Sequence, residues 1–135
     1  MAVSNLQETL LMYTKYKSML TKQINDVEFN LLAATRKVLD LQSKYNDKQQ
    51  AYYYYYNQDG MEEYHDEYTY LCEQMEKEYE FSLQNINSWN MELEAQKDNY
   101  ETRYNEITAH ENSFRALLKS NIKIDFTYGG TQQGG

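Results

Sequence analysis

The sequence predicts an all-α fold: a long antiparallel two-helix coiled-coil hairpin that assembles into an oligomeric helical bundle. Three observations predict it. The 135-residue chain contains no proline, the residue that most strongly interrupts a helix. Its only glycine before residue 129 is Gly60, which leaves two long stretches without a helix-breaking residue. Each stretch repeats apolar residues at alternating spacings of three and four, the pattern of a left-handed coiled coil.

The first helix is expected over residues 4–57, where the repeat continues for more than fifty residues. Fourteen of its sixteen seam positions are apolar or aromatic, and the exceptions are Lys17 and Lys48. A repeat sustained over this length predicts one uninterrupted helix that buries one face. The two rows that form this seam are Val3, Leu10, Lys17, Ile24, Leu31, Val38, Tyr45 and Tyr52, and Leu6, Tyr13, Leu20, Val27, Ala34, Leu41, Lys48 and Tyr55.

A turn is expected at residues 58–60, because Asp59 and Gly60 supply the positive φ that a chain reversal needs. Acidic residues follow at once and complement the dipole of a new helix, expected over residues 61–120. Two successive four-residue steps after Met75 locally unwind the supercoil. The seam positions of this helix are Met61, Tyr64, Tyr68, Leu71, Met75, Tyr79, Leu83, Ile86, Asn90, Leu93, Lys97, Tyr100, Tyr104, Ile107, Glu111, Phe114 and Leu118.

The C-terminal segment changes period. In residues 121–128 apolar residues alternate with polar ones, which is typical of a half-buried strand. A single strand cannot satisfy its ladder hydrogen bonds within its own chain. We therefore expect an extended segment that pairs with another molecule, lies against the helices, or stays disordered. Residues 129–135 are expected to form a flexible glycine-rich tail. The alternating apolar residues are Ile122, Ile124, Phe126 and Tyr128.

The charge of the chain excludes two classes of partner. The net charge is -8, distributed as +1 over residues 1–60 and -9 over residues 61–120. This balance argues against binding nucleic acid, which requires clustered cations, and against docking on an anionic membrane surface. No apolar run is long enough for membrane insertion, and the N-terminus lacks a signal-peptide pattern. The expected location is therefore cytoplasmic by default, with export that needs no cleaved signal left open.

No motif in the sequence predicts catalysis or a cofactor. Glu62 and His65 have the Glu-x-x-His spacing of carboxylate-bridged metal bundles, so a metal-binding helical bundle is one alternative function. Such a site needs a second motif, but the residue three before His110, the only other histidine, is Ile107. We expect these residues to form solvated acidic surface. Phosphate loops, nucleophile elbows and Cys/His clusters are absent, so we do not expect an enzyme.

The 15 tyrosines exceed what one seam can bury. Tyrosine suits protein interfaces because it offers apolar area and a hydroxyl that tolerates water. We therefore expect a homo-oligomer, a dimer or tetramer, and possible contact with another protein. Stacking on single-stranded nucleic acid needs a cationic groove, whereas residues 61–80 carry eight acids. The candidate partner-binding residues are Tyr52, Tyr53, Tyr54, Tyr55 and Tyr56 at the tip, and Ile122, Ile124, Phe126 and Tyr128 in the C-terminal segment.

Within the tyrosine run, one interpretation makes Tyr52 and Tyr55 seam residues and assigns the others to contact with a neighbouring subunit. The second is an adhesive tip that contacts a partner. Together these features predict a non-enzymatic structural or assembly protein, a coiled-coil scaffold that acts through self-association or partner binding. The build is similar to filament, stalk and export-chaperone components of bacterial secretion machines. That likeness of architecture implies, as an alternative, a secretion-type chaperone or filament component that binds one client.

Overall fold

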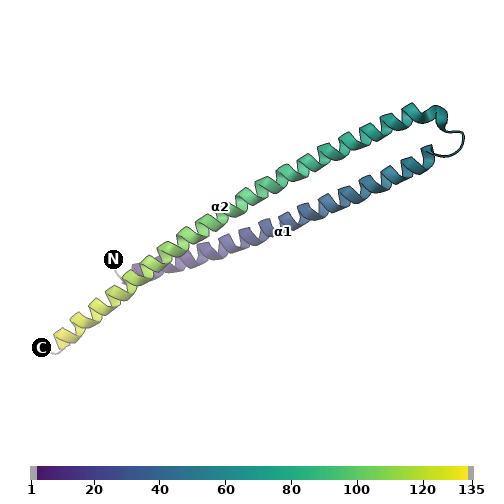
Figure 1. The fold of residues 1–135 in the computed structure, drawn as a ribbon. Coiled ribbons are helices and arrows are strands. Elements are labelled where there is room, and N and C mark those ends of the chain that lie inside the picture. The colour runs from purple at the N-terminus through teal and green to yellow at the C-terminus, as the bar shows by residue number, and fades with distance from the viewer. Residues whose placement is uncertain (1–2, 134–135) are drawn as a thin grey trace. The chain divides into compact units, whose positions relative to one another are not determined.

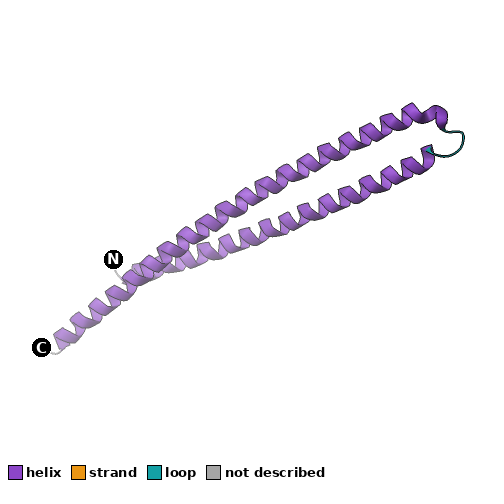
Figure 2. Ribbon diagram, in the orientation of Figure 1, coloured by secondary structure: helices purple, strands orange, loops and turns teal. Residues whose placement is uncertain are grey.

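Two helices account for nearly all of the described chain. The computed structural model describes residues 3–133, with side chains described for residues 3–124. Helix α1 (Val3–Tyr56) and helix α2 (His65–Gln133) are joined by a short loop and the 3₁₀ helix η1 (Glu62–Tyr64). They form an antiparallel hairpin (Figure 1), and Figure 2 shows no strand among the described residues. The predicted all-α hairpin is confirmed.

The hairpin divides into two compact units. The terminal unit contains Met1–Val27 and Gln96–Gly135, and the turn unit contains Glu28–Ala95. In each unit a stretch of α1 lies beside an antiparallel stretch of α2. Each unit therefore has its own section of the seam, and the two sections are described separately below.

The buried side chains lie at the predicted seam positions. Every predicted seam residue from Met61 to Leu118 is buried or half-buried except Tyr64 of η1, so the four-residue steps after Met75 are confirmed. A polar residue, Glu111, is also buried there. Among the side chains that the structure describes, the buried apolar ones are Leu6, Leu20 and Val27 in the terminal unit, and Ala34, Met75 and Leu93 in the turn unit.

Near the turn, the predicted seam of α1 is wrong at two positions. Lys48 and Tyr55 are exposed, and Tyr56 is half-buried in place of Tyr55. The ring of Tyr56 packs against Tyr68 of α2, with 5.3 Å between centroids. A four-residue step from Tyr52 to Tyr56 therefore replaces the expected three-residue step. Exposure of Lys48 keeps its ammonium group in water, where a charge is most stable.

Local hydrogen bonds close the turn. The backbone N–H of Asn57 donates to the carbonyl of Tyr53 at 3.1 Å, and its side-chain Nδ2 donates to the same oxygen at 2.7 Å. The N–H of Met61 donates to the carbonyl of Gln58 at 3.3 Å. Gly60 has φ of 84°, a conformation that is costly for residues with a side chain. The predicted turn and its positive φ are confirmed.

Helix α2 begins later and ends later than expected. It starts at His65 rather than at residue 61, because residues 62–64 form η1, a tighter 3₁₀ turn. The predicted extended segment over residues 121–128 is instead part of α2. A continued helix satisfies its backbone groups internally, which a lone strand cannot do. Of the predicted flexible tail, residues 129–133 also belong to α2, and residues 134–135 lie outside the described residues.

We expect the seam of the terminal unit to tolerate no loss of volume at Leu20, which has no exposed surface. Leu20→Ala should lower the free energy of unfolding by about 2–3 kcal/mol, because it removes buried methyl groups and leaves a cavity. Leu117→Ala, an exposed leucine in the same unit, is the control and should cost about 0.5 kcal/mol or less. Urea unfolding followed by circular dichroism measures both, and equal losses would contradict the seam assignment.

Candidate association surfaces

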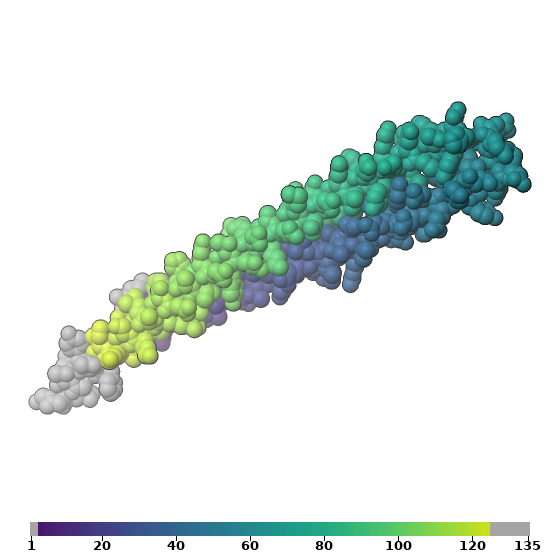
Figure 3. Space-filling model, in the orientation of Figure 1, coloured from purple at the N-terminus to yellow at the C-terminus, as the bar shows by residue number. Residues whose placement is uncertain are grey.

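The predicted tyrosines gather at the tip of the turn unit. Tyr53, Tyr54 and Tyr55 are 62%, 74% and 55% exposed, while Tyr52 and Tyr56 are half-buried. Figure 3 shows this end of the turn unit, in teal, uncovered by other segments of that unit on the face in view. The structure thus brings together the five tyrosines that the sequence singled out. We call this region, residues 49–76, the tyrosine tip.

At the tyrosine tip the ring of Tyr56 contacts the rings of Tyr55 and Tyr68. The ring of Tyr55 meets Tyr56 edge-on, with 5.0 Å between centroids. Burial raises the pKa of Tyr56, and the charge and hydrogen bond of Glu67 raise it further. Burial likewise raises the pKa of Tyr68, together with a hydrogen bond to Cys72. These two hydroxyls therefore stay neutral well above physiological pH, and the tip offers uncharged rings.

The predicted C-terminal residues are not part of this tip. Ile122 and Ile124 lie in the terminal unit and are exposed. Phe126 and Tyr128 lie outside the residues whose side chains are described. A role of these four residues in binding a partner stays a prediction.

Exposed apolar side chains on α1 form a row that the sequence analysis missed. In the turn unit Phe29, Leu32 and Leu39 are 69%, 52% and 60% exposed. Their spacings of three and seven place them on one face of α1. We call them the leucine row. The sequence signal for this row is a repeat of leucine outside the seam: Leu11, Leu32 and Leu39 share one heptad position.

A second exposed row lies on α1 in the terminal unit. Met12, Tyr16 and Met19 follow each other at spacings of four and three, and both methionines are exposed. With Ile107 of α2 they line an open groove of about 590 Å³, with Lys15 at its edge. We call these three residues the methionine row. Methionine adapts its shape to different apolar partners, so such a groove suits contact with another helix.

A buried carboxylate interrupts the apolar seam of the terminal unit. Glu111 is only 5% exposed, and its Oε1 lies 3.6 Å from Nζ of Lys17 and 3.2 Å from Nη2 of Arg115. Nζ of Lys17 also lies 4.9 Å from the centroid of the Tyr104 ring. Lys17, the polar residue in the first half of the α1 seam, thus faces Glu111 in the α2 seam. The pair compensates a charge whose burial would otherwise be costly.

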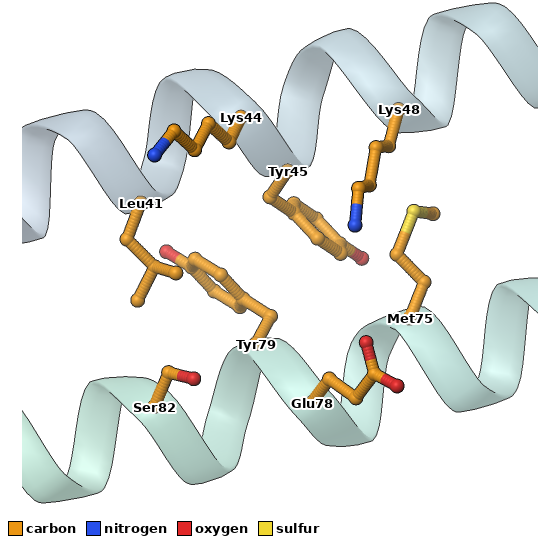
Figure 4. Close-up of a pocket in the computed structure, with 8 residues that line it drawn as sticks. All are labelled: Leu41, Lys44, Tyr45, Lys48, Met75, Glu78, Tyr79 and Ser82. Carbon is orange, nitrogen blue, oxygen red and sulfur yellow. The ribbon is translucent and has the colours of Figure 1, made fainter.

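A cavity of about 310 Å³ opens in the turn unit where the α2 seam takes its four-residue steps. Tyr45 and Tyr79 stack inside it with 4.4 Å between ring centroids, and Lys48 and Glu78 reach toward it from opposite helices (Figure 4). Burial raises the pKa of Tyr45, and the charge of Glu76 raises it further. Its lining also includes Leu41, Met75 and the hydroxyl of Ser82.

Neither a metal site nor a membrane span is found among the residues that the structure describes. Among the side chains described, no group of three or more His, Cys, Asp or Glu residues could hold a metal ion. Glu62 and His65 both line a cavity at the tyrosine tip. None of the helical stretches that the structure describes combines the length and apolar character needed to cross a bilayer.

Comparisons with protein-family models, with curated proteins and with solved structures found no significant match.

We expect Lys17 and Glu111 to be energetically coupled. Lys17→Met leaves Glu111 with Arg115 alone, and Glu111→Leu leaves Lys17 without its carboxylate. Each should cost about 1–3 kcal/mol, less than for a fully buried pair because Arg115 is largely exposed. The double variant makes both positions apolar and should cost less than the sum by at least about 1 kcal/mol. Urea unfolding of the four proteins measures the coupling; additive losses would show that the two residues act independently.

Proposed function

We propose that this chain is a non-enzymatic assembly protein, a coiled-coil hairpin that associates with further copies of itself through the outer face of α1. The observation that carries this proposal is the leucine row, Phe29, Leu32 and Leu39, which remains exposed on a helix whose other apolar face is already occupied by α2. A helix with a second apolar row on one face is suited to contact a further helix.

The magnitude of the burial shows how far the leucine row alone can support association. Covering a half-exposed leucine or phenylalanine contributes about 1–2 kcal/mol. In a two-fold symmetric contact both copies supply the row, so six side chains contribute roughly 6–12 kcal/mol. Association costs about 4–15 kcal/mol in lost translational and rotational freedom. The leucine row alone is therefore marginal, so we expect a weak association that falls apart on dilution unless further apolar area is buried.

The charge distribution also favours contact through α1. Residues 1–60 have a net charge of +1, and residues 61–120 have a net charge of -9. Contact between two α1 helices brings together nearly neutral surfaces, whereas contact between two α2 helices would bring together like charges. The acidic α2 helices would then face outward and limit further aggregation. Two such hairpins make a four-helix bundle, the dimer that the composition predicts.

The same rows would suit a secretion-type chaperone that binds one client or a component of a filament. These functions differ in what the purified chain does alone. Self-association predicts a molar mass that is a multiple of 16.2 kDa with no client present. A dedicated chaperone that needs its client to cover the rows predicts a mass near 16.2 kDa.

We expect Phe29→Gln/Leu32→Gln/Leu39→Gln to weaken self-association by at least about a hundredfold, because the variant removes the apolar area of the leucine row. Helicity should stay near that of the parent chain, since these side chains are exposed and lie outside the seam. Sedimentation velocity over a range of concentrations measures the association, and circular dichroism measures the helicity.

The matched control is Phe81→Gln/Met91→Gln, which removes exposed apolar side chains from α2 in the same unit. It should leave the association unchanged. A leucine-row variant that sediments like the parent chain would contradict the proposal, and so would an equal effect of the control.

A further inference from the structure

The tyrosine tip has an unusual composition for its size. Residues 49–76 contain eight of the 15 tyrosines and seven acidic side chains, but no lysine or arginine. Elsewhere in the chain basic residues are interspersed with acidic ones, from Lys15 to Lys48 and again from Lys77 onward. The tip is therefore the longest segment of the chain without a lysine or an arginine, and it holds more than half of the tyrosines.

Five tyrosines of the tip lie at the surface, and one of them, Tyr53, also lines a cavity. Tyr53, Tyr54, Tyr55, Tyr64 and Tyr70 are exposed, as are the acidic side chains of Glu62, Glu63 and Asp66. The cavity has a volume of about 390 Å³. Its lining includes Tyr53, Tyr56, Met61, Glu62, His65 and Tyr68. Three tyrosines and the carboxylate of Glu62 thus line a space large enough for a long side chain.

Elsewhere the chain uses its own cations on its aromatic rings. Nζ of Lys17 lies 4.9 Å from the Tyr104 centroid, and Nζ of Lys37 lies 4.9 Å from the Trp89 centroid. Such contacts arise because the face of an aromatic ring carries negative electrostatic potential. The exposed rings of the tyrosine tip offer the same kind of face to a cation from another molecule, since residues 49–76 contain neither lysine nor arginine.

We propose that the tyrosine tip is a docking surface for an arginine-rich segment of a partner protein, whose guanidinium groups stack on the exposed tyrosine rings and pair with the neighbouring carboxylates. Arginine fits better than lysine, because its planar guanidinium stacks on aromatic faces and binds a carboxylate through two parallel hydrogen bonds. This proposal rests on the proposed function, because it names the class of partner that the assembly protein would bind. It uses a surface separate from the leucine and methionine rows.

The test measures binding of a fluorescein-labelled oligoarginine peptide to the full chain by fluorescence polarisation, with oligolysine and oligoglutamate peptides for comparison. The parent chain should bind oligoarginine more tightly than oligolysine and should not bind oligoglutamate. Because any acidic protein attracts polycations, the variants decide whether the tip is responsible. No binding of oligoarginine by the parent chain at physiological salt would overturn the proposal.

Two variants separate the rings from the charges of the tip. Tyr53→Ala/Tyr54→Ala/Tyr64→Ala removes exposed rings and keeps the net charge, and Glu62→Gln/Glu63→Gln/Asp66→Asn removes charges and keeps the rings. Each should weaken oligoarginine binding about tenfold or more. Tyr54→Ala alone removes the most exposed ring of the run with the least risk to folding, and should weaken binding about twofold or more.

The matched controls remove the same features elsewhere. Glu92→Gln/Glu94→Gln/Asp98→Asn changes the net charge equally at exposed positions of α2, and Phe81→Ala removes an exposed ring. Both should bind oligoarginine within about twofold of the parent chain. Equal weakening by the α2 charge variant would show attraction by net charge alone and would overturn the proposal, as would unchanged binding by both ring variants. Sedimentation should show self-association unchanged in the tip variants, so this inference and the self-association proposal can fail independently.

Discussion

A hairpin of two helices can bury only the side chains that lie between them, and this constraint governs the rest of the structure. Leu6 and Leu20 have no exposed surface, yet Ile24 and Leu31, in the same seam, are only half-buried. Within residues 3–133 neither unit has a third layer that could cover the remaining apolar groups. The exposed leucine row, methionine row and tyrosine tip are consequences of this narrow core, and each is available for contact with another molecule.

The seam must also select one alignment of its two helices. Apolar rows that repeat every seven residues pack almost equally well after a slip of one heptad. Such a slip would place Lys17 opposite a heptad neighbour of Glu111, either Tyr104 or Leu118, and would leave the buried carboxylate with Arg115 as its cation but without Lys17. Breaking a buried ion pair in this way is costly. The contact between Lys17 and Glu111 therefore contributes specificity of register in the terminal unit, whatever it contributes to stability.

Long repetition explains what could be predicted from the sequence. The seam could be assigned almost residue by residue, because a misassignment at one position conflicts with dozens of others. Local features were harder. Tyr56 replaces Tyr55 in the seam because of its packing on Tyr68, a contact that depends on how the turn brings the two helices together. The alternation over residues 121–128 was too short to outweigh continuation of α2.

The same limits apply to the candidate surfaces. The five tyrosines of the tip were evident from composition, but their cavity depends on the conformation of the turn. The leucine row has spacings of three and seven, so the three-and-four repeat that predicts the seam does not predict it.

The most direct test of the account is the molar mass of the unmodified chain in solution, measured by light scattering on a size-exclusion column. At tens of micromolar the account predicts twice or four times 16.2 kDa, with the mass falling on dilution. A mass of 16.2 kDa throughout the concentration range would contradict it, because the outer rows of α1 would then remain exposed to water in the isolated protein.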